Sequence, residues 1–419
     1  MLPNPPPLTP SKKTAIARLV PLLLRSTVGQ EFCAKLLMIY FDSAATTQLD
    51  ERVLDAMLPY LREQYGNPSS IHSMGRQVRA AIEKARKTVA THLNASIGEI
   101  YFTSGGTESN NMALSGAVRD LGVRHIITSP LEHHCVLHRA ESLHRFRNVS
   151  LHYVEHQPDG HINLDHLDSL LTETRHSAPR IVSLMHGNNE IGNLIDLAQV
   201  ADICQSQQAY FHTDTVQTFG YYPIDVQKIP VHFLSGSAHK FHGPKGVGFI
   251  YVNNKSPINP YLWGGAQERN MRAGTENVSG IVGLGKAVEI AYADLDKNRT
   301  AITDLKNYFI TQLRTLLPAV QFNGDLAQGA YKVLNVSFPP NAHNDLLLFN
   351  LDIAGICASG GSACSSGADA GSHVLNAMGI DPNRANVRFS FSKYNTRDEI
   401  DIALDKLANI LKWSNYLAL

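Results

Sequence analysis

The sequence predicts an α/β fold in which a largely parallel sheet is covered by helices on both faces. Between residues 99 and 215, short apolar segments alternate with segments of helical length. This alternation of strands and helices is typical of a parallel sheet. The 419 residues are enough for two domains, or for one large α/β domain with a smaller partner. Sheets of this kind bind ligands at the carboxyl ends of their strands.

The elements follow one another in order from Met38 onward. An apolar segment at 39–41 predicts a strand, and residues 51–64 and 75–93 predict helices. The second helix is amphipathic, because Val78, Ile82, Val89 and Leu93 recur on one face. Strands are then predicted at 99–103, 124–130, 149–156, 180–186 and 209–215, and helices at 107–122, 132–146, 164–174 and 196–207.

The remaining third of the chain predicts a second, α+β unit. Apolar strands at 231–234 and 247–252 belong to the first unit, and a long helix at 278–298 joins the two. Helices are expected at 304–317, at 342–355 and from Arg397 onward, with strands at 331–338 and 386–392. A loop rich in glycine and serine lies between the last two helices.

Residues 1–37 differ from the rest of the chain. The first thirteen residues are rich in proline and are expected to be extended or disordered. The following residues are mildly amphipathic, basic and poor in acids, as in some targeting segments. A third interpretation is that Met38 is the true start and that residues 1–37 come from an upstream start codon.

Composition narrows the classes of partner. The formal net charge is zero, so no electrostatic argument favours direct binding of nucleic acid or an anionic membrane. No run of eighteen apolar residues predicts a membrane span. The five cysteines are far apart and suggest neither a disulfide framework nor a CxxC metal site. A reducing compartment fits this pattern, and we therefore expect a cytoplasmic protein.

The stretch from Val231 to Val252 places a lysine between two apolar strands. Small residues precede His239 and Lys240, and a glycine turn follows them. Burial lowers the pKa of a lysine, and a neutral amine is the nucleophile that forms a Schiff base with a carbonyl. The alternative is a buried lysine paired with a carboxylate. Lys240 is thus a candidate for covalent attachment of a carbonyl cofactor.

Polar residues also follow three other strands. Gly106 and Thr107 open a helix after a glycine turn, which favours an anion site, although a plain helix cap is the alternative. Asp214 ends a buried strand and needs a partner, such as a pyridinium nitrogen. A histidine of Glu132–His134 could stack on a planar ring or act as an acid or base. His134 and His138 have the spacing of metal ligands on a helix, but no acidic or cysteine ligand completes a site.

The segment from Ser359 to Ser372 surrounds Cys364 with glycine, serine and alanine. A structural cysteine prefers apolar surroundings, whereas one in an exposed loop is available as a nucleophile. The alternative is an incidental surface cysteine. Arg388, on a predicted strand, could hold a substrate carboxylate with its fork of donors.

Nine motifs in this order resemble the cysteine desulfurases of the NifS/IscS type, in the class V group of pyridoxal-phosphate enzymes. They are YFDSAATT, GNPSSIHSMG, FTSGGTESNN, EHH, MHGNNEIG, HTDTVQTFG, SGSAHKFHGPKG, RAGTEN and SGGSACSSG. The resemblance runs from about Met38 to the C-terminus. It implies fold type I of these enzymes, with a mostly parallel seven-stranded sheet in a large domain at 49–297. Residues 38–48 and 298–419 would form the smaller α+β domain that carries Cys364.

The resemblance implies pyridoxal 5′-phosphate as the cofactor. Lys240 would form the Schiff base, Asp214 would hold the ring nitrogen and Gln217 the ring hydroxyl. His133, the first histidine of EHH, would stack on the ring and take part in catalysis. The phosphate would be bound by residues from two loops, namely Gly106, Thr107, Ser237 and His239.

The same resemblance implies the reaction and the partners. Asn189, also next to the cofactor, and Arg388 would hold the carboxylate of L-cysteine. Cys364 would take the sulfur as a persulfide, leaving L-alanine, and pass it to an acceptor or scaffold protein for iron–sulfur clusters, thio-cofactors or tRNA thiolation. Thr275, in RAGTEN, would reach the phosphate of the other subunit of a homodimer. No metal site is implied, apart from contact of Cys364 with a nascent cluster on a partner.

Two kinds of alternative stay open at this point. Within the fold, the chain could be a selenocysteine lyase or another class V transaminase, although a transaminase needs no cysteine loop. In a different class, it could be an inactive scaffold that only binds sulfur-acceptor proteins. The presence of Lys240 and Asp214 argues against such a scaffold.

Overall fold

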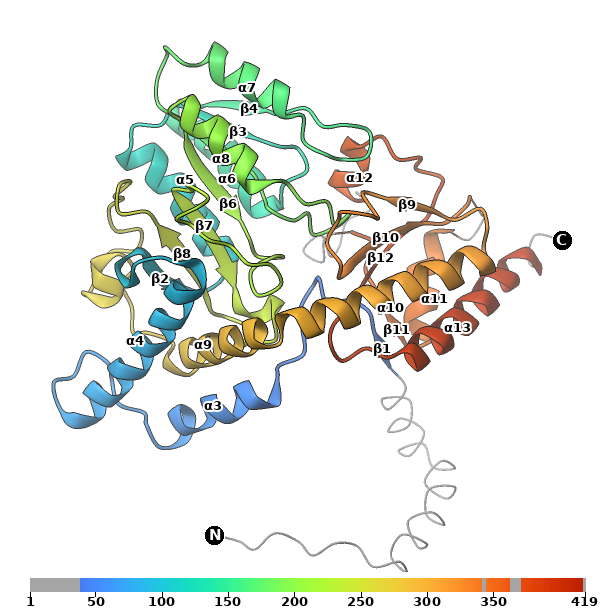
Figure 1. Cartoon of the computed structure of the whole chain (residues 1–419), viewed down its shortest axis with the longest axis horizontal. Helices are drawn as coiled ribbons and strands as arrows, with labels where there is room; N and C mark the ends of the chain where they lie inside the picture. Colours follow the sequence, from blue (N-terminus) through green and yellow to red (C-terminus); the bar gives the residue numbers. More distant parts are fainter. Residues whose placement is uncertain (1–37, 341–343, 362–370, 417–419) are drawn as a thin grey trace, which may run out of the picture.

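A seven-stranded sheet forms the centre of the larger part of the molecule (Figure 1). The computed structural model describes residues 38–340, 344–361 and 371–416. β8 runs antiparallel to both of its neighbours, and all other neighbouring pairs in this sheet are parallel. The predicted mostly parallel α/β fold is therefore confirmed. The order across the sheet is β2 (Ile100–Thr103), β8 (Gly248–Val252), β7 (Phe233–Ser237), β6 (Tyr210–Asp214), β5 (Arg180–Ser183), β3 (His125–Thr128) and β4 (Ser150–Tyr153).

Alternating residues of the strands face two separate apolar cores. In β3, Ile126 packs in one core and Ile127 in the other, and Ile181 and Val182 of β5 divide in the same way. Successive side chains of a strand point to opposite faces, so a strand buried on both faces is apolar throughout. This explains the continuous apolar runs that predicted the strands.

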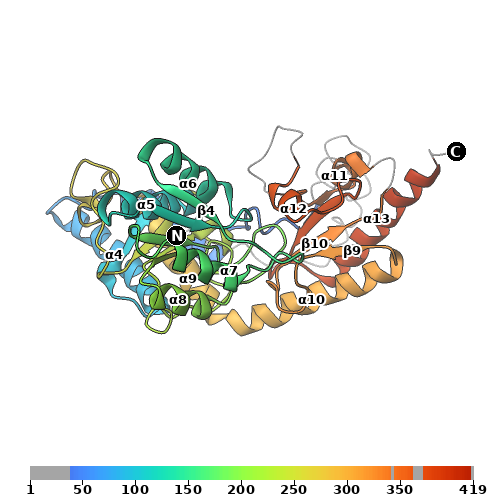
Figure 2. The same ribbon diagram turned by 90° about the horizontal axis from the view of Figure 1, so that it is seen from above.

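Helices cover both faces of the sheet. Figure 2 shows α5 (Gly106–Asp120) and α6 (His134–Arg147) on one side and α8 (Leu197–Ser206) and α9 (Val278–Ala293) on the other. Several of the helices begin at a side-chain cap; Asp196, for example, accepts hydrogen bonds from two backbone N–H groups of α8. The remaining helices of this part are α3 (Glu51–Arg62), α4 (Ser73–Leu93) and α7 (Leu164–Glu173).

The C-terminal part contains two small sheets. β12 (Asn386–Ser390), β10 (Val333–Ser337) and β9 (Gln321–Asn323) form one antiparallel sheet in that order. The second sheet joins the start of the described chain to this part, because β1 (Ile39–Tyr40) pairs in parallel with β11 (Ile356–Cys357). The helices here are α10 (Leu295–Leu316), α11 (Leu347–Ile353), α12 (His373–Ala377) and α13 (Arg397–Tyr416). Phe41 packs edge to face against both Phe309 and Phe389 in the core between them.

The link between the two parts differs from the expected helices at 278–298 and 304–317. α9 ends at Ala293 and α10 begins at Leu295, so only Asp294 separates them. Asp294 has φ −99° and ψ 10°, which bends the path. Its N–H donates to the carbonyl of Ile290, and its carbonyl accepts from Asn298, so hydrogen bonding continues across the bend. α10 then runs beneath the C-terminal part in Figure 1. Within the described residues, no helix is long and apolar enough to cross a membrane.

Candidate active site

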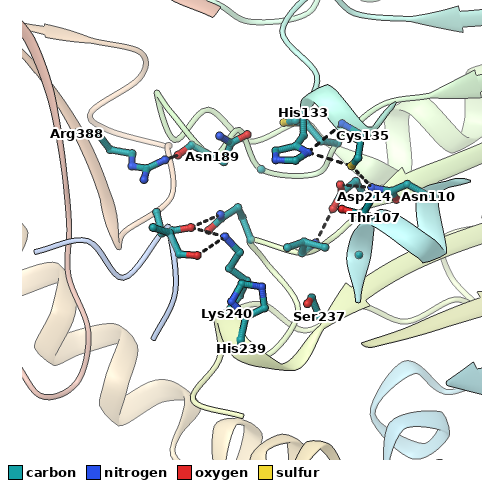
Figure 3. Close-up of a pocket in the computed structure, with 17 residues that line it drawn as sticks. Thr107, Asn110, His133, Cys135, Asn189, Asp214, Ser237, His239, Lys240 and Arg388 are labelled. Atoms are coloured by element: carbon teal, nitrogen blue, oxygen red, sulfur yellow. Dashed lines mark hydrogen bonds between the residues drawn. The ribbon is translucent and has the colours of Figure 1, made fainter. Parts of the chain in front are cut away.

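A cavity of about 160 Å³ lies at the carboxyl ends of β6 and β7, next to the starts of α5 and α6 (Figure 3). Ten of the residues predicted to act together line it. They are Gly106, Thr107, His133, Asn189, Asp214, Gln217, Ser237, His239, Lys240 and Arg388. The rule that ligands bind at the carboxyl ends of parallel strands therefore locates this cavity correctly.

Lys240 ends a short 3₁₀ turn (Ala238–Lys240) that follows β7 directly. Its Nζ donates to the carbonyl oxygens of Ala44 and Ala45 at 2.6 and 2.8 Å. The hydroxyl of Tyr221 donates to the carbonyl of Lys240 at 2.9 Å, which fixes the backbone beneath the side chain. The amine thus points across the floor of the cavity toward the turn that follows β1.

Asp214 is a buried carboxylate at the end of β6. It accepts hydrogen bonds from the N–H of Val216 at 2.8 Å and from Nδ2 of Asn110 at 2.6 Å. Burial raises the pKa of Asp214, while these two donors and Lys240 act in the opposite direction. Neither hydrogen-bonding partner carries a charge, so this carboxylate suits a cationic ring nitrogen.

The start of α5 is open toward the cavity. No side chain caps the helix at Gly105, which has φ 151°, and free N–H groups at such a terminus bind anions. A Cβ atom on Gly106 would lie 2.5 Å from a methyl group of Val216, so only glycine fits this approach. A Cβ atom on Gly105 would lie 3.6 Å from Oγ of Ser237, which therefore borders the same space. Backbone donors and the Ser237 hydroxyl together suit a phosphate.

His133 caps α6 and lies across the cavity from Lys240 (Figure 3). Its Nδ1 accepts from the N–H of Cys135 at 3.2 Å and lies 3.0 Å from the Cys135 sulfur. Burial, with a smaller contribution from Lys240, lowers the pKa of His133 to about 4. The imidazole is therefore neutral near pH 7, which suits a ring that stacks on another planar ring.

Arg388 comes from β12 and enters the cavity from the C-terminal part. It donates to the carbonyl of Asn189 at 2.8 Å and to Asp42 at 2.9 Å. Its side chain is almost completely buried, and Nε has no hydrogen-bond partner among the described residues. A guanidinium with a donor left over in a buried position suits a small carboxylate.

Two further predicted residues stand at the edges of this arrangement. Nδ1 of His239 lies 3.1 Å from the hydroxyl of Thr46, and burial lowers the pKa of His239 to about 4. Gln217 donates through Nε2 to the carbonyl of Ala44 at 2.9 Å. Its buried Oε1 finds no partner in the described part of the chain and could accept a hydrogen bond from a ring hydroxyl.

One predicted residue lies outside this cavity. Thr275 lines a separate cavity together with Thr103 and Arg272. The loop that carries it is held in place by Glu268, whose carboxylate lies 2.6 and 2.9 Å from the guanidinium nitrogens of Arg86. Cys364 lies outside the described residues.

The cavity also contains residues that sequence reasoning did not single out. Asn110 lies one helical turn after Gly106 and holds Asp214, and Cys135 follows His133 by two positions. Ala44 and Ala45 supply the carbonyl groups that hold Lys240. Helical spacing from Gly106 is a signal for Asn110, whereas no spacing points to the two alanines.

These features fit pyridoxal phosphate. One cavity is lined by the amine of Lys240, by the buried carboxylate of Asp214, which has only uncharged hydrogen-bond partners, and by the uncapped start of α5. Oε1 of Gln217 is a hydrogen-bond acceptor there that has no partner among the described residues. No group of three histidine, cysteine or acidic residues in the described ranges is arranged to hold a metal ion.

Comparison with known proteins gives one consistent result. The family model for class V aminotransferases matches residues 39–403. A protein of Dictyoglomus turgidum named cysteine desulfurase IscS is 42% identical over 89% of this chain and 94% of its own length. A solved NifS-like protein is 37% identical, with a TM-score of 0.83, and covers 90% of this chain and all of its own. A structure described as SspA in complex with cysteine is 30% identical, with a TM-score of 0.74, and covers 85% of this chain and all of its own. The chain therefore belongs to the class V aminotransferase family, among its IscS- and NifS-like members.

Proposed function

We propose that the protein is a cysteine desulfurase, which converts L-cysteine to L-alanine and retains the sulfur as a persulfide on Cys364. The observation that carries this proposal is the convergence of Lys240, Asp214, His133 and Arg388 on one cavity. The first three suit pyridoxal phosphate, and Arg388 adds a site for an amino-acid carboxylate. The identity to proteins named cysteine desulfurase supports the choice of substrate and reaction.

The cofactor would be held at four points. Lys240 would bind it covalently through its amine, Asp214 would pair with the ring nitrogen, and the start of α5 with Ser237 would bind the phosphate. His133 would lie against the face of the ring. When bound, pyridoxal phosphate supplies an electron sink that stabilises negative charge on the Cα of an amino acid.

The chain's own residues would then orient the substrate and move its protons. Arg388, supported by Asp42, would bind the carboxylate together with Asn189, and so direct the thiol side chain toward the cavity mouth. Lys240, released when the substrate amine takes its place, would accept the Cα proton. Its hydrogen bonds to the carbonyls of Ala44 and Ala45 are a resting position that the amine would occupy between transfers.

Cys364 would take the sulfur as a thiolate that attacks Sγ of the substrate. The new S–S bond forms as the C–S bond breaks, and the electron pair of the C–S bond stays with the carbon, which is protonated to give alanine. The persulfide would next pass to a thiol of an acceptor or scaffold protein for iron–sulfur clusters or thiolated products.

The assembly would be a homodimer in which Thr275 of each subunit reaches the phosphate bound by the other. The position of Thr275 outside the cavity of its own chain supports this arrangement. We also infer domains at 49–297 and at 38–48 with 298–419, because β1 pairs with β11. A cytoplasmic location fits the scarcity of cysteines.

The test compares sulfide and alanine release from L-cysteine, in the presence of a reductant, for the parent, Cys364→Ala and Cys357→Ala. The control cysteine lies on β11 and is only partly exposed. We expect both products from the parent and from Cys357→Ala, and loss of sulfide in Cys364→Ala with the cofactor absorbance retained. Full activity of Cys364→Ala would refute the persulfide role and favour a lyase.

A further inference from the structure

The start of α6 brings a thiol against the imidazole that faces the cavity. The Cys135 sulfur lies 3.0 Å from Nδ1 of His133 and 3.1 Å from Nδ2 of Asn110 (Figure 3). The same Asn110 amide holds Asp214 at 2.6 Å. The sulfur therefore connects the group proposed to stack on the cofactor with the group that supports its ring-nitrogen partner.

The backbone determines which nitrogen of His133 carries the proton. The N–H of Cys135 points at Nδ1 from 3.2 Å, in the helix-capping position. A backbone N–H can only donate, so Nδ1 has to be the nitrogen with the free lone pair. A neutral imidazole then carries its proton on Nε2, and burial keeps His133 neutral by lowering its pKa to about 4. The charged or titratable groups around this ring are Lys240, His134, His138 and His373.

The direction of the sulfur contact follows from this tautomer. Because Nδ1 is an acceptor, the Cys135 thiol has to donate its S–H proton to it. Burial, and then the nearby Asp214, raise the pKa of Cys135 to about 12, so the thiol keeps that proton. Two further groups contact the sulfur: the N–H₂ group of Asn110 donates to it, and the Thr107 side chain hydrogen-bonds to the same thiol.

We propose that Cys135 is a positioning residue, which fixes His133 with its proton on Nε2 and holds its ring in place beside the cavity. This inference rests on the proposed function, since it concerns the imidazole next to the substrate. A protonated thiol is a weak nucleophile, so Cys135 is not a second sulfur acceptor. The chain thus assigns different chemistry to two cysteines: Cys364 reacts, and Cys135 orients.

The direct test is the infrared S–H stretching band of the cofactor-loaded protein. This band lies apart from other protein absorption and moves to lower frequency when the S–H group donates a hydrogen bond. The difference spectrum of the parent minus Cys135→Ser isolates the Cys135 band. We expect it at the low-frequency position, and we expect His133→Ala to move it to the position of a free thiol. A Cys135 band already at the free position in the parent would overturn the proposal.

The second readout is the acid limb of the pH profile for alanine formation. Loss of the S–H donor makes Nδ1 more basic, so Cys135→Ala should raise the pH of that limb by about 0.5–1 unit. Cys135→Ser keeps a donor and should stay close to the parent. Cys204→Ala, a buried cysteine on α8 away from the cavity, is the matched control and should leave the limb unchanged. If the acid limb moved by the same amount in Cys135→Ser and Cys135→Ala, Cys135 would contribute packing alone and not a hydrogen bond to His133.

The two readouts also separate this inference from the proposed function. If the parent forms no alanine from L-cysteine but shows the low-frequency band, the reaction is wrong and the tautomer assignment stands. If the parent forms alanine and the band lies at the free position, the desulfurase stands and the role of Cys135 is refuted.

Discussion

Replacement of Asp214 by asparagine tests the centre of the proposed site. Asparagine keeps the size of the side chain and one oxygen that can accept from the N–H of Val216. In the parent, this N–H lies 2.8 Å from Oδ1 of Asp214. Its N–H₂ group would meet the N–H₂ group of Asn110, so Asn110 has to turn its amide. This is possible because Oδ1 of Asn110 has no hydrogen-bond partner in the described ranges. The substitution therefore removes the negative charge and leaves the packing in place.

The magnitude follows from the contact that is lost. A hydrogen bond to a charged group contributes about 1.5–3 kcal/mol, so the dissociation constant of pyridoxal phosphate should rise about 10- to 150-fold. The thermal stability of the apoprotein, in contrast, should not fall in this variant. Burial raises the pKa of Asp214, so the folded state binds this proton more tightly than the unfolded chain, and the parent loses stability as pH rises through that interval. Asp214→Asn lacks this loss and should melt at an equal or higher temperature near pH 7.

The assay combines an absorbance titration of the apoprotein with the cofactor, alanine formation at saturating cofactor, and thermal unfolding at several pH values. Asp196→Asn is the control, because asparagine caps a helix as well as aspartate does, and Asp196 caps α8 without lining the cavity. We expect weaker cofactor binding and slower alanine formation in Asp214→Asn alone. If this variant binds the cofactor and forms alanine like the parent, the pairing of Asp214 with the ring nitrogen is refuted.

Three further predictions concern binding and stability. Arg388→Lys keeps the charge but loses the guanidinium fork, so the KM for L-cysteine should rise about tenfold with unchanged cofactor binding; an unchanged KM would contradict the carboxylate role. Glu268→Gln breaks a buried ion pair with Arg86, so the free energy of unfolding in urea should fall by about 3–5 kcal/mol; equal stability of variant and parent would count against this. Lys332→Met removes a buried amine that has no hydrogen-bond partner among the residues described, and should stabilise the protein by about 1–3 kcal/mol at neutral pH. Because burial lowers the pKa of Lys332, the unfolded chain binds its proton more tightly, so the parent should gain stability as pH rises toward the ordinary lysine pKa; the same gain in Lys332→Met would refute this cause.

Sequence periodicity predicted the fold well because each strand of the sheet is buried on both faces or bounded by clear turns. The bend at Asp294 was missed because helical hydrogen bonding continues through it, so no glycine or proline marks the change. The strand-end rule led to Asp214 and Lys240, since Asp214 ends the buried strand β6 and Lys240 ends the short turn that follows β7. The type of each element was therefore easier to predict than its last residue.

The supporting contacts of the site could not be predicted in the same way. Asn110 and Cys135 meet because α5 and α6 start side by side, and the sequence does not show how two helix termini lie in space. The same holds for Asp42, which pairs with Arg388 from the opposite end of the chain. The spacing of residues along the sequence predicts single helices and strands, whereas these contacts form only when the elements are assembled around the sheet.

The pairing of β1 with β11 has a consequence for synthesis of the protein. Most of the described chain lies between Ile39 and its partner Ile356, so this contact closes a very long loop. Contacts between residues so far apart in sequence form late and slow down folding. During translation, β1 has to wait for its partner until β11 has left the ribosome. The central sheet can assemble first, and the strand that precedes the turn at Ala44 and Ala45, whose carbonyl groups hold Lys240, is paired only when most of the chain has been made.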